Sequence, residues 1–318
     1  MMDQPEILSA NNVPGKKKNR TWTIVKVVVS SILLILLITQ VKWQAFFAVL
    51  TSISLIYLLY PLIAYYVNVG LSVIKWRALL ENMAIIDKFG KLFAIYLTGA
   101  FYNNFLPSTI GGDGYRFLEM RSNHPGKSEQ VFSSILLERG FGYLVLIIVN
   151  LVFAIYFRDL VYTQPWLFII EIALAGGLAL GTLLWLFRDR FANALGQVRF
   201  LNKIFQFLRY LDIHNPKVVA ISFGTSLLFV LISGVWLAVY YWSVGANVNW
   251  LYAIYVSTVV NIVGAVPITL NGLGVVELLQ VQLMGLVGVP VETVLVVSLM
   301  SRVLLAVFSL PGGLLSFR

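Results

Sequence analysis

Long apolar runs alternate with short polar stretches along nearly the whole chain. A helix of about 20 apolar residues crosses a bilayer core of about 30 Å, and six runs have about that length. The pattern therefore predicts an all-α polytopic membrane protein. Residues 21–318 would form a single membrane domain behind a polar cytoplasmic tail of residues 1–20. The six predicted spans lie at about residues 22–40, 43–67, 131–157, 166–187, 218–242 and 291–313.

Two further apolar segments, residues 92–106 and 250–266, are short for a full crossing, and each runs into a stretch rich in Pro and Gly. These stretches, residues 107–116 (PSTIGGDGYR) and 267–277 (PITLNGLGVVE), share the pattern P-x-T-(I/L)-x-G-x-G. Non-helical backbone is not stable against lipid, so it belongs where protein or a water-filled cavity surrounds it. We therefore predict two re-entrant hairpins, each of which turns at its Pro/Gly stretch and returns to the side from which it entered.

The distribution of Lys and Arg orients the spans, because cytoplasmic loops of membrane proteins carry an excess of cations. Basic residues gather at residues 16–20 (KKKNR), 75–91 and 188–217, and we assign all three segments to the cytoplasm. The first hairpin must then open toward the cytoplasm and the second toward the outside. The halves, residues 21–160 and 161–318, form an inverted-topology repeat of the kind common in secondary transporters. Both termini would lie on the cytoplasmic side of a plasma (inner) membrane.

Composition supports the membrane assignment and narrows the chemistry. Hydrophobic residues make up 59% of the chain and charged residues only 12%, against about 25% charged residues in globular domains. The chain has no cysteine, and its two histidines have no partners at metal-ligand spacing, so we expect no disulfide, metal or cofactor. The net charge of +9 is explained by the cytoplasmic loops, and we expect no nucleic-acid partner.

Two arginines, Arg139 and Arg302, fall inside predicted spans, one in each half. A charge at mid-span costs at least about 2.5 kcal/mol and usually faces a partner or a polar cavity. The repeat suggests that Arg139 pairs with Asp113 and that Arg302 pairs with Glu277. Glu138 points to a different helix face from its neighbour Arg139, so we do not expect these two to pair. The arginines either line a substrate path or tie the hairpins to the spans.

We predict that the two hairpin tips meet near the membrane midplane and enclose a polar substrate path. The turn after each proline would begin a half-helix, with Thr109 or Thr269 as a candidate N-cap. The free N–H groups and positive dipole at such a helix end favour an anion. The predicted path residues are Asn103, Asn104, Pro107, Thr109, Gly112, Asp113, Arg116, Glu138, Arg139, Pro267, Thr269, Gly272, Gly274, Glu277 and Arg302.

Several of these residues also have plain structural interpretations. Asn103 and Asn104 would then only satisfy interrupted backbone, and the glycines would serve tight turns and close helix approach. Glu277 is either a proton-coupling carboxylate or a structural partner of an arginine. Glu171, in the predicted span 166–187, is expected near the membrane interface and without a function.

The run from Asn103 to Arg116, the pair Glu138–Arg139 and the later Pro267…Gly272-Leu-Gly…Glu277 together resemble the lysylphosphatidylglycerol synthase transmembrane (flippase-like) family. The resemblance covers about residues 20–315. It implies a membrane domain of the kind associated with moving aminoacylated phospholipids between leaflets. The chain ends at Arg318 without the soluble aminoacyl-transferase domain of the full synthases, so the resemblance implies translocation and argues against synthesis by this chain.

We therefore expect a non-enzymatic lipid translocase or transporter for a lipid with an anionic or zwitterionic headgroup. One alternative is an integral-membrane enzyme that acts on a lipid phosphate or polyprenyl carrier, with Asp113, Glu138 or Glu277 as acid or base. No recognised catalytic constellation supports it, and we name no catalytic residue. A second alternative is a membrane scaffold for a separate synthase or glycosyltransferase. The expected partner is a membrane lipid, with such an enzyme as a possible second partner.

Overall fold

The computed structural model describes residues 42–105, 111–187, 215–266 and 269–316, together with single positions between 28 and 39. This part of the chain is helical and contains no strand. Three predicted features lie wholly or largely outside the described residues. They are the first span (22–40), most of the basic segment 188–217 and three path residues. Those three path residues are Pro107, Thr109 and Pro267.

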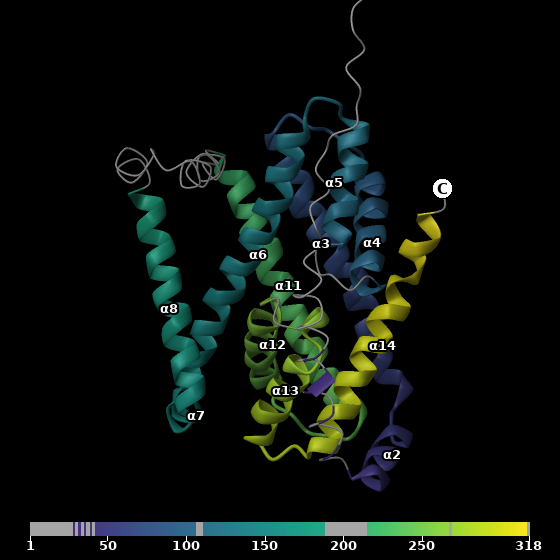
Figure 1. The fold of residues 1–318 in the computed structure, drawn as a ribbon, viewed down its shortest axis with the longest axis vertical. Coiled ribbons are helices and arrows are strands. Elements are labelled where there is room, and N and C mark those ends of the chain that lie inside the picture. Colours follow the sequence, from purple (N-terminus) through teal and green to yellow (C-terminus); the bar gives the residue numbers. More distant parts are fainter. Residues whose placement is uncertain are drawn as a thin grey trace, which may run out of the picture.

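Helices of very different length follow one another along the chain (Figure 1). The first half contains α2 (Trp43–Thr51), η1 (Leu55–Leu58), α3 (Leu59–Asn82), α4 (Phe89–Phe105), α5 (Gly111–Asn123) and α6 (Ser128–Tyr156), and the short helix α7 (Arg158–Thr163) spans the boundary between the halves. The second contains α8 (Pro165–Leu186), α11 (Pro216–Ser243), α12 (Trp250–Gly264), η2 (Leu270–Gly272), α13 (Val275–Gly285) and α14 (Val291–Leu315).

Five of the described helical segments are long and apolar enough to cross a membrane. Four of them match predicted spans closely, namely Ser128–Tyr156, Pro165–Leu184, Pro216–Ser243 and Val291–Leu315. The fifth, Leu55–Asn82, corrects the predicted span 43–67.

The correction has a local cause in residues 51–54. The Thr51 hydroxyl donates to the Phe47 carbonyl and the Ser52 hydroxyl to the Val49 carbonyl, so both side chains bond back onto the end of α2. The Ser54 N–H then bonds to the Ser243 carbonyl at 2.8 Å instead of continuing a helix. The next helical segment begins at Leu55 and carries Lys75 and Arg77 inside α3, where a cytoplasmic loop was predicted.

At the position of each predicted hairpin, the structure has two short helices that pack on one another, α4 with α5 and α12 with α13. Figure 1 shows the first pair beside the upper parts of α3 and α6, and the second pair in the lower half of the molecule. A Cβ atom added to Gly112 would lie 2.0 Å from the Gly99 carbonyl oxygen, so α4 and α5 touch backbone to backbone. The turn before α13 instead uses left-handed backbone at Asn271, Gly272 and Gly274.

Helices of the two halves pack on one another around the central helices α3 and α11 (Figure 1). In the first half α6 packs on α12, and in the second half α14 packs on α4. The Thr98 hydroxyl donates to the Gly312 carbonyl at 3.0 Å, and a Cβ on Gly312 would lie 2.2 Å from the Leu97 carbonyl oxygen. Each hairpin is therefore covered by a long helix of the other half.

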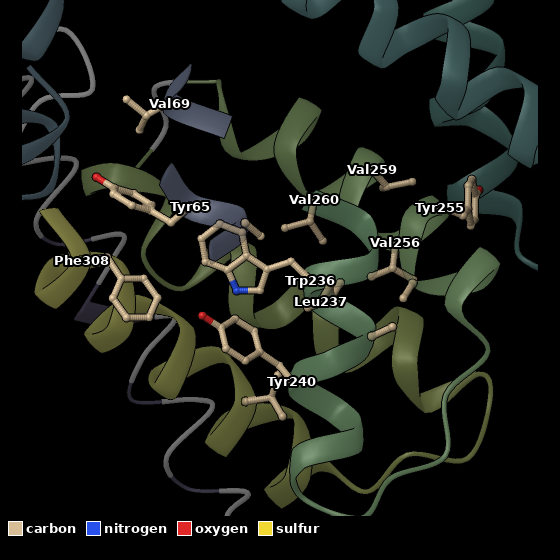
Figure 2. Packing of buried hydrophobic residues seen from close by; sticks show 14 of the residues in the cluster. Tyr65, Val69, Trp236, Leu237, Tyr240, Tyr255, Val256, Val259, Val260 and Phe308 are labelled. Atoms are coloured by element: carbon tan, nitrogen blue, oxygen red, sulfur yellow. The ribbon is translucent and has the colours of Figure 1, made fainter. Parts of the chain in front are cut away.

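The apolar core lies between α3, α11, α12 and α14. Figure 2 shows Tyr65, Trp236 and Phe308 gathered from three different helices. The Tyr65 ring lies 6.4 Å from Trp236 in an edge-on contact and 5.9 Å from Phe308, between ring centroids. Aromatic contacts of this kind add packing energy beyond the area they bury, and here they join α3 to α11 and α14.

Polar contacts hold the loop between α3 and α4 against the loop between α5 and α6. Asp87 accepts one hydrogen bond from Lys91 at 2.9 Å, and its second oxygen lies 2.7 Å from His124 Nε2. Lys127 donates to the Ala84 carbonyl at 2.6 Å. Partial burial raises the pKa of Asp87, but the hydrogen bonds and charges of His124 and Lys91 together outweigh it, so the pKa lies below its ordinary value of 3.8.

Candidate functional site: a charged pocket between six helices

A pocket of about 260 Å³ lies between α3, α4, α5, α6, α11 and α12. Five charged side chains line it, which are Lys75, Asp113, Arg116, Glu138 and Arg139. Its remaining polar wall is neutral and is built by Ser72, Tyr96, Asn103, Tyr143, Ser226, Ser233, Ser257 and Asn261. The first hairpin and the central helices thus converge on one polar space.

The five charges form one connected network. Arg116 Nη1 lies 2.9 Å from Glu138 Oε2 and 3.2 Å from Asp113 Oδ1. Lys75 Nζ lies 3.5 Å from Glu138 Oε1, and Arg139 Nε donates to Asp113 Oδ2. Lys75, Arg116 and Glu138 are each at most 6% exposed, whereas the Arg139 side chain is 35% exposed. The network therefore has a buried centre and a partly open edge at Arg139.

Arg116 occupies the centre between two aromatic rings. Its guanidinium carbon lies 4.0 Å from the ring centroid of Trp76 and 4.2 Å from that of Tyr96, a cation–π arrangement that stabilises a desolvated charge. Both rings are fixed, because Trp76 Nε1 donates to the Ser134 hydroxyl at 3.0 Å and the Tyr96 hydroxyl donates to Glu138 at 3.3 Å.

One edge of the Arg116 guanidinium has no hydrogen-bond partner in the described part of the chain. Nη1 makes both ion pairs, while Nε and Nη2 are buried without an acceptor. Nε and Nη2 form the side-on fork with which arginine binds two oxygens of a carboxylate or phosphate. Because buried donors are normally satisfied, this edge is the strongest indication of a ligand at the pocket.

Lys75 is a pocket residue that sequence reasoning missed. Its ammonium group donates to the Ser226 hydroxyl at 3.1 Å and faces Glu138. The signal that could have revealed it is the spacing of Asn68, Ser72 and Lys75, which places three polar side chains on one face of α3. All three are buried, and Asn68 donates to the Ser233 hydroxyl of α11 at 3.0 Å.

The second predicted ion pair is also present. Arg302 Nε lies 2.6 Å from Glu277 Oε1, as Arg139 pairs with Asp113, so both predicted pairs are confirmed. The other Glu277 oxygen accepts the Gly274 N–H at 2.7 Å and caps α13. Thr269 was the candidate cap, but α13 begins only at Val275, and the Thr269 hydroxyl makes no hydrogen bond among the described residues.

The second Pro/Gly stretch contacts the end of α4, just before the first stretch, through two asparagines. Asn271 Nδ2 donates to the Asn103 carbonyl at 3.4 Å, and Arg302 Nη1 donates to the Asn271 carbonyl at the same distance. Asn103 Oδ1 accepts the Gly112 N–H at 2.8 Å, and Asn104 donates to the Leu305 carbonyl at 3.2 Å. Both asparagines therefore satisfy backbone groups at the hairpin, and Asn103 also lines the pocket.

The structure divides the predicted path residues into two groups. Asn103, Asp113, Arg116, Glu138 and Arg139 share the pocket. Glu277 and Arg302 form a separate ion pair that does not line it, and Gly272 and Gly274 shape the turn beside that pair. Gly112 serves the contact between α4 and α5. Among the described residues, no group of three or more His, Cys, Asp or Glu side chains is arranged to hold a metal ion.

The apolar spans and the charged pocket define a multi-pass helical membrane protein. The family model described as the lysylphosphatidylglycerol synthase TM region matches residues 23–313, and the chain belongs to this family. No curated protein matches the chain in a sequence search.

Proposed function

We propose that this chain is a lipid translocase, which moves a lipid with an anionic or zwitterionic headgroup between the leaflets of a plasma membrane. The proposal places both termini in the cytoplasm and the two hairpins in an inverted repeat. Membership of the lysylphosphatidylglycerol synthase TM family supports a role in lipid handling. A separate synthase or glycosyltransferase would supply the lipid.

The observation that carries the proposal is the charge of the pocket. Three cations, Lys75, Arg116 and Arg139, face two carboxylates, Asp113 and Glu138. With all five groups ionised, one positive charge remains without a counter-charge within this set. A phosphodiester carries one negative charge and two free oxygens, so it would both neutralise the pocket and engage the side-on fork of Arg116.

The exposure of the arginines suggests the order of contact. Arg139 is the more exposed, so its guanidinium would meet a headgroup first. The Arg116 fork is covered in this conformation, so reaching it requires a small displacement of the surrounding side chains. The acyl tails would remain in the bilayer while the headgroup passes between the helices.

The same ion pairs favour transport over catalysis. Asp113 contacts two arginines, and Glu138 contacts Arg116 and Lys75. All four oxygens of these two carboxylates thus contact a cationic side chain of the protein. Neither carboxylate is therefore well placed to act as a general acid or base, and we propose that the chain works without covalent chemistry.

Headgroup translocation in proteoliposomes tests the proposal. Arg116→Lys keeps the charge but removes the fork. We expect translocation to fall at least about tenfold, because a hydrogen bond to a charged group contributes about 1.5–3 kcal/mol. Arg77→Lys is the matched control, since Arg77 is a half-buried neighbour of Trp76 that pairs with Glu81, and it should translocate at the parent rate.

Three outcomes would contradict the proposal. One is a purified parent protein that moves no phospholipid headgroup. Another is a folded Arg116→Lys variant that works as fast as the parent. The third is turnover of a lipid headgroup by the purified chain alone, which would favour the enzymatic alternative.

A further inference from the structure

A buried carboxylate outside the pocket has a different environment from all the others described. Glu171 lies on α8 and is only 6% exposed. One oxygen accepts a hydrogen bond from Asn150 Nδ2 at 2.6 Å, and the other accepts one from the Tyr255 hydroxyl at 2.8 Å. Within the described ranges, no cation forms an ion pair with Glu171.

The partners of Glu171 belong to a network that joins three helices. Asn150 comes from α6, and Tyr255 and Thr258 come from α12. The Thr258 hydroxyl lies 2.9 Å from Asn150 Oδ1 and 2.7 Å from the Tyr255 carbonyl oxygen. Asn150 and Thr258 are fully buried. These hydrogen bonds thus form a small buried polar network that links α8 to α6 and α12.

Glu171 differs from the other buried or partly buried carboxylates within the membrane helices in the charge of its partners. Asp113, Glu138 and Glu277 each contact at least one arginine, whereas Glu171 has neutral partners only. An ionised carboxylate is costly to bury without a cation, and binding a proton removes that cost. We propose that Glu171 is a proton-binding site, and that its protonation alters the packing of α6 and α12 and thereby the shape of the pocket.

Protonation forces a change in the hydrogen bonds. The ionised carboxylate accepts from Asn150 and from Tyr255 and needs no donor of its own. A proton taken up from water onto one oxygen turns that oxygen into a donor, which requires an acceptor. The Asn150 amide nitrogen cannot accept, and Asn150 Oδ1 already faces the Thr258 hydroxyl. Tyr255 must therefore rotate its hydroxyl to accept, or the contact between α8 and α12 is lost.

None of the other described charged groups on the neighbouring helices forms an ion pair with Glu171. On α7, Arg158 and Asp159 lie 3.8 Å apart and are largely exposed. The Tyr252 hydroxyl donates to the Leu283 carbonyl at 2.6 Å. The titratable and charged groups on the packed elements are Glu129, Glu138, Arg139, Tyr143 and Tyr156 of α6, Arg158, Asp159 and Tyr162 of α7, and Tyr252 and Tyr255 of α12. Of these described groups, only Tyr255 forms a hydrogen bond with Glu171.

The network reaches the pocket through its two outer helices. Leu146 of α6 lines the pocket and lies one helical turn from Asn150. Ser257 of α12 also lines the pocket and is the neighbour of Thr258. The lining of the pocket includes no described residue of α8. A rearrangement at Glu171 would therefore act on the pocket through α6 and α12, and this second part of the inference rests on the proposed function.

Infrared difference spectroscopy across a titration from about pH 5 to about pH 8 tests the proton site directly. We expect a C=O stretching band of a protonated carboxyl group that disappears in Glu171→Gln and persists in the control Asp159→Asn. Tyr255→Phe removes one hydrogen bond from the ionised form, so the midpoint of the band should rise by about one to two pH units. No titrating band, or a band that survives in Glu171→Gln, would overturn the proposal.

Binding of a soluble phosphodiester headgroup, glycerophosphoglycerol, tests the link to the pocket. The parent should show a pH-dependent affinity whose midpoint follows the infrared titration, and Glu171→Gln should bind with an affinity that no longer changes over this range. Equal pH dependence in the parent and the variant would overturn the link. If the parent does not bind this probe at any pH, the proposed function fails while the infrared result still decides the proton site.

Discussion

The contact between α4 and α5 makes a sharp prediction about a single glycine. In Gly112→Ala the added Cβ would lie 2.0 Å from the Gly99 carbonyl oxygen and 2.8 Å from Asn103 Cγ. Cβ atoms essentially never approach closer than 3.0 Å, so α5 must move away from α4 by about 1 Å. That movement weakens the hydrogen bond from Gly112 N–H to Asn103 and displaces the adjacent Asp113.

The expected cost follows from these two losses. Overpacking costs about 1–3 kcal/mol, and the weakened hydrogen bond adds about 1 kcal/mol. The sum of about 2–4 kcal/mol corresponds to a fall in Tm of roughly 3–6 °C for a chain of this size. Gly114→Ala is the matched control, because it lies in the same helix and no atom of the described residues comes within 4 Å of the added Cβ. It should raise stability by about 0.4–1 kcal/mol through the unfolded state.

Thermal unfolding of the parent and both variants in the same detergent provides the measurement. We expect Gly112→Ala to unfold well below the parent, and Gly114→Ala at or slightly above it. Equal melting temperatures for the parent and Gly112→Ala would refute the close packing of α4 and α5. An equal loss in both variants would show that α5 tolerates no alanine for a reason other than this contact.

Two further predictions concern the ion pairs. Arg302→Ala leaves the Glu277 carboxylate, whose side chain is 9% exposed, without its cation, so the free energy of unfolding should fall by about 3 kcal/mol. Glu277→Gln in the same chain should restore most of that loss, and equal unfolding curves for the single and double variants would contradict the pair. The lowered pKa of Asp87 means that its carboxylate stabilises the fold above pH 3.8 and that this contribution disappears as the pH falls further. The melting temperature of Asp87→Asn should therefore lie below that of the parent at neutral pH and converge with it in acid. If the plots of melting temperature against pH stay parallel for the two proteins, the contacts of Asp87 with His124 and Lys91 are contradicted.

The ion pairs of Arg139 and Arg302 were predictable from the sequence because an arginine inside a span needs a partner. The internal repeat limited the candidates to the acidic residues beside each Pro/Gly stretch. The aromatic enclosure of Arg116 by Trp76 and Tyr96 was not predictable, because it depends on how α3, α4 and α5 pack. Sequence spacing orders residues along one helix, but it does not fix which faces of three helices meet.

The error at Lys75 has a different origin. A basic residue after an apolar run resembles the start of a loop, and nothing in local hydropathy shows that Thr51 and Ser52 end α2 early. The helix that follows is displaced toward the C-terminus, and Lys75 enters a buried network with Glu138 and Ser226. The hydrogen bonds of Glu171 were not predictable for a related reason, because its partners lie on α6 and α12 and only the tertiary fold brings them together.

The packing of α14, from the second half, on α4, from the first half, has a consequence for biosynthesis. The ribosome completes the first hairpin long before α14, which supplies the Gly312 carbonyl for Thr98 and the Leu305 carbonyl for Asn104. Until residues 291–315 have been inserted, one face of α4 must be covered by lipid, by the insertion machinery or by a provisional neighbour. The contacts of the first hairpin are thus completed only after α14 has been made and inserted.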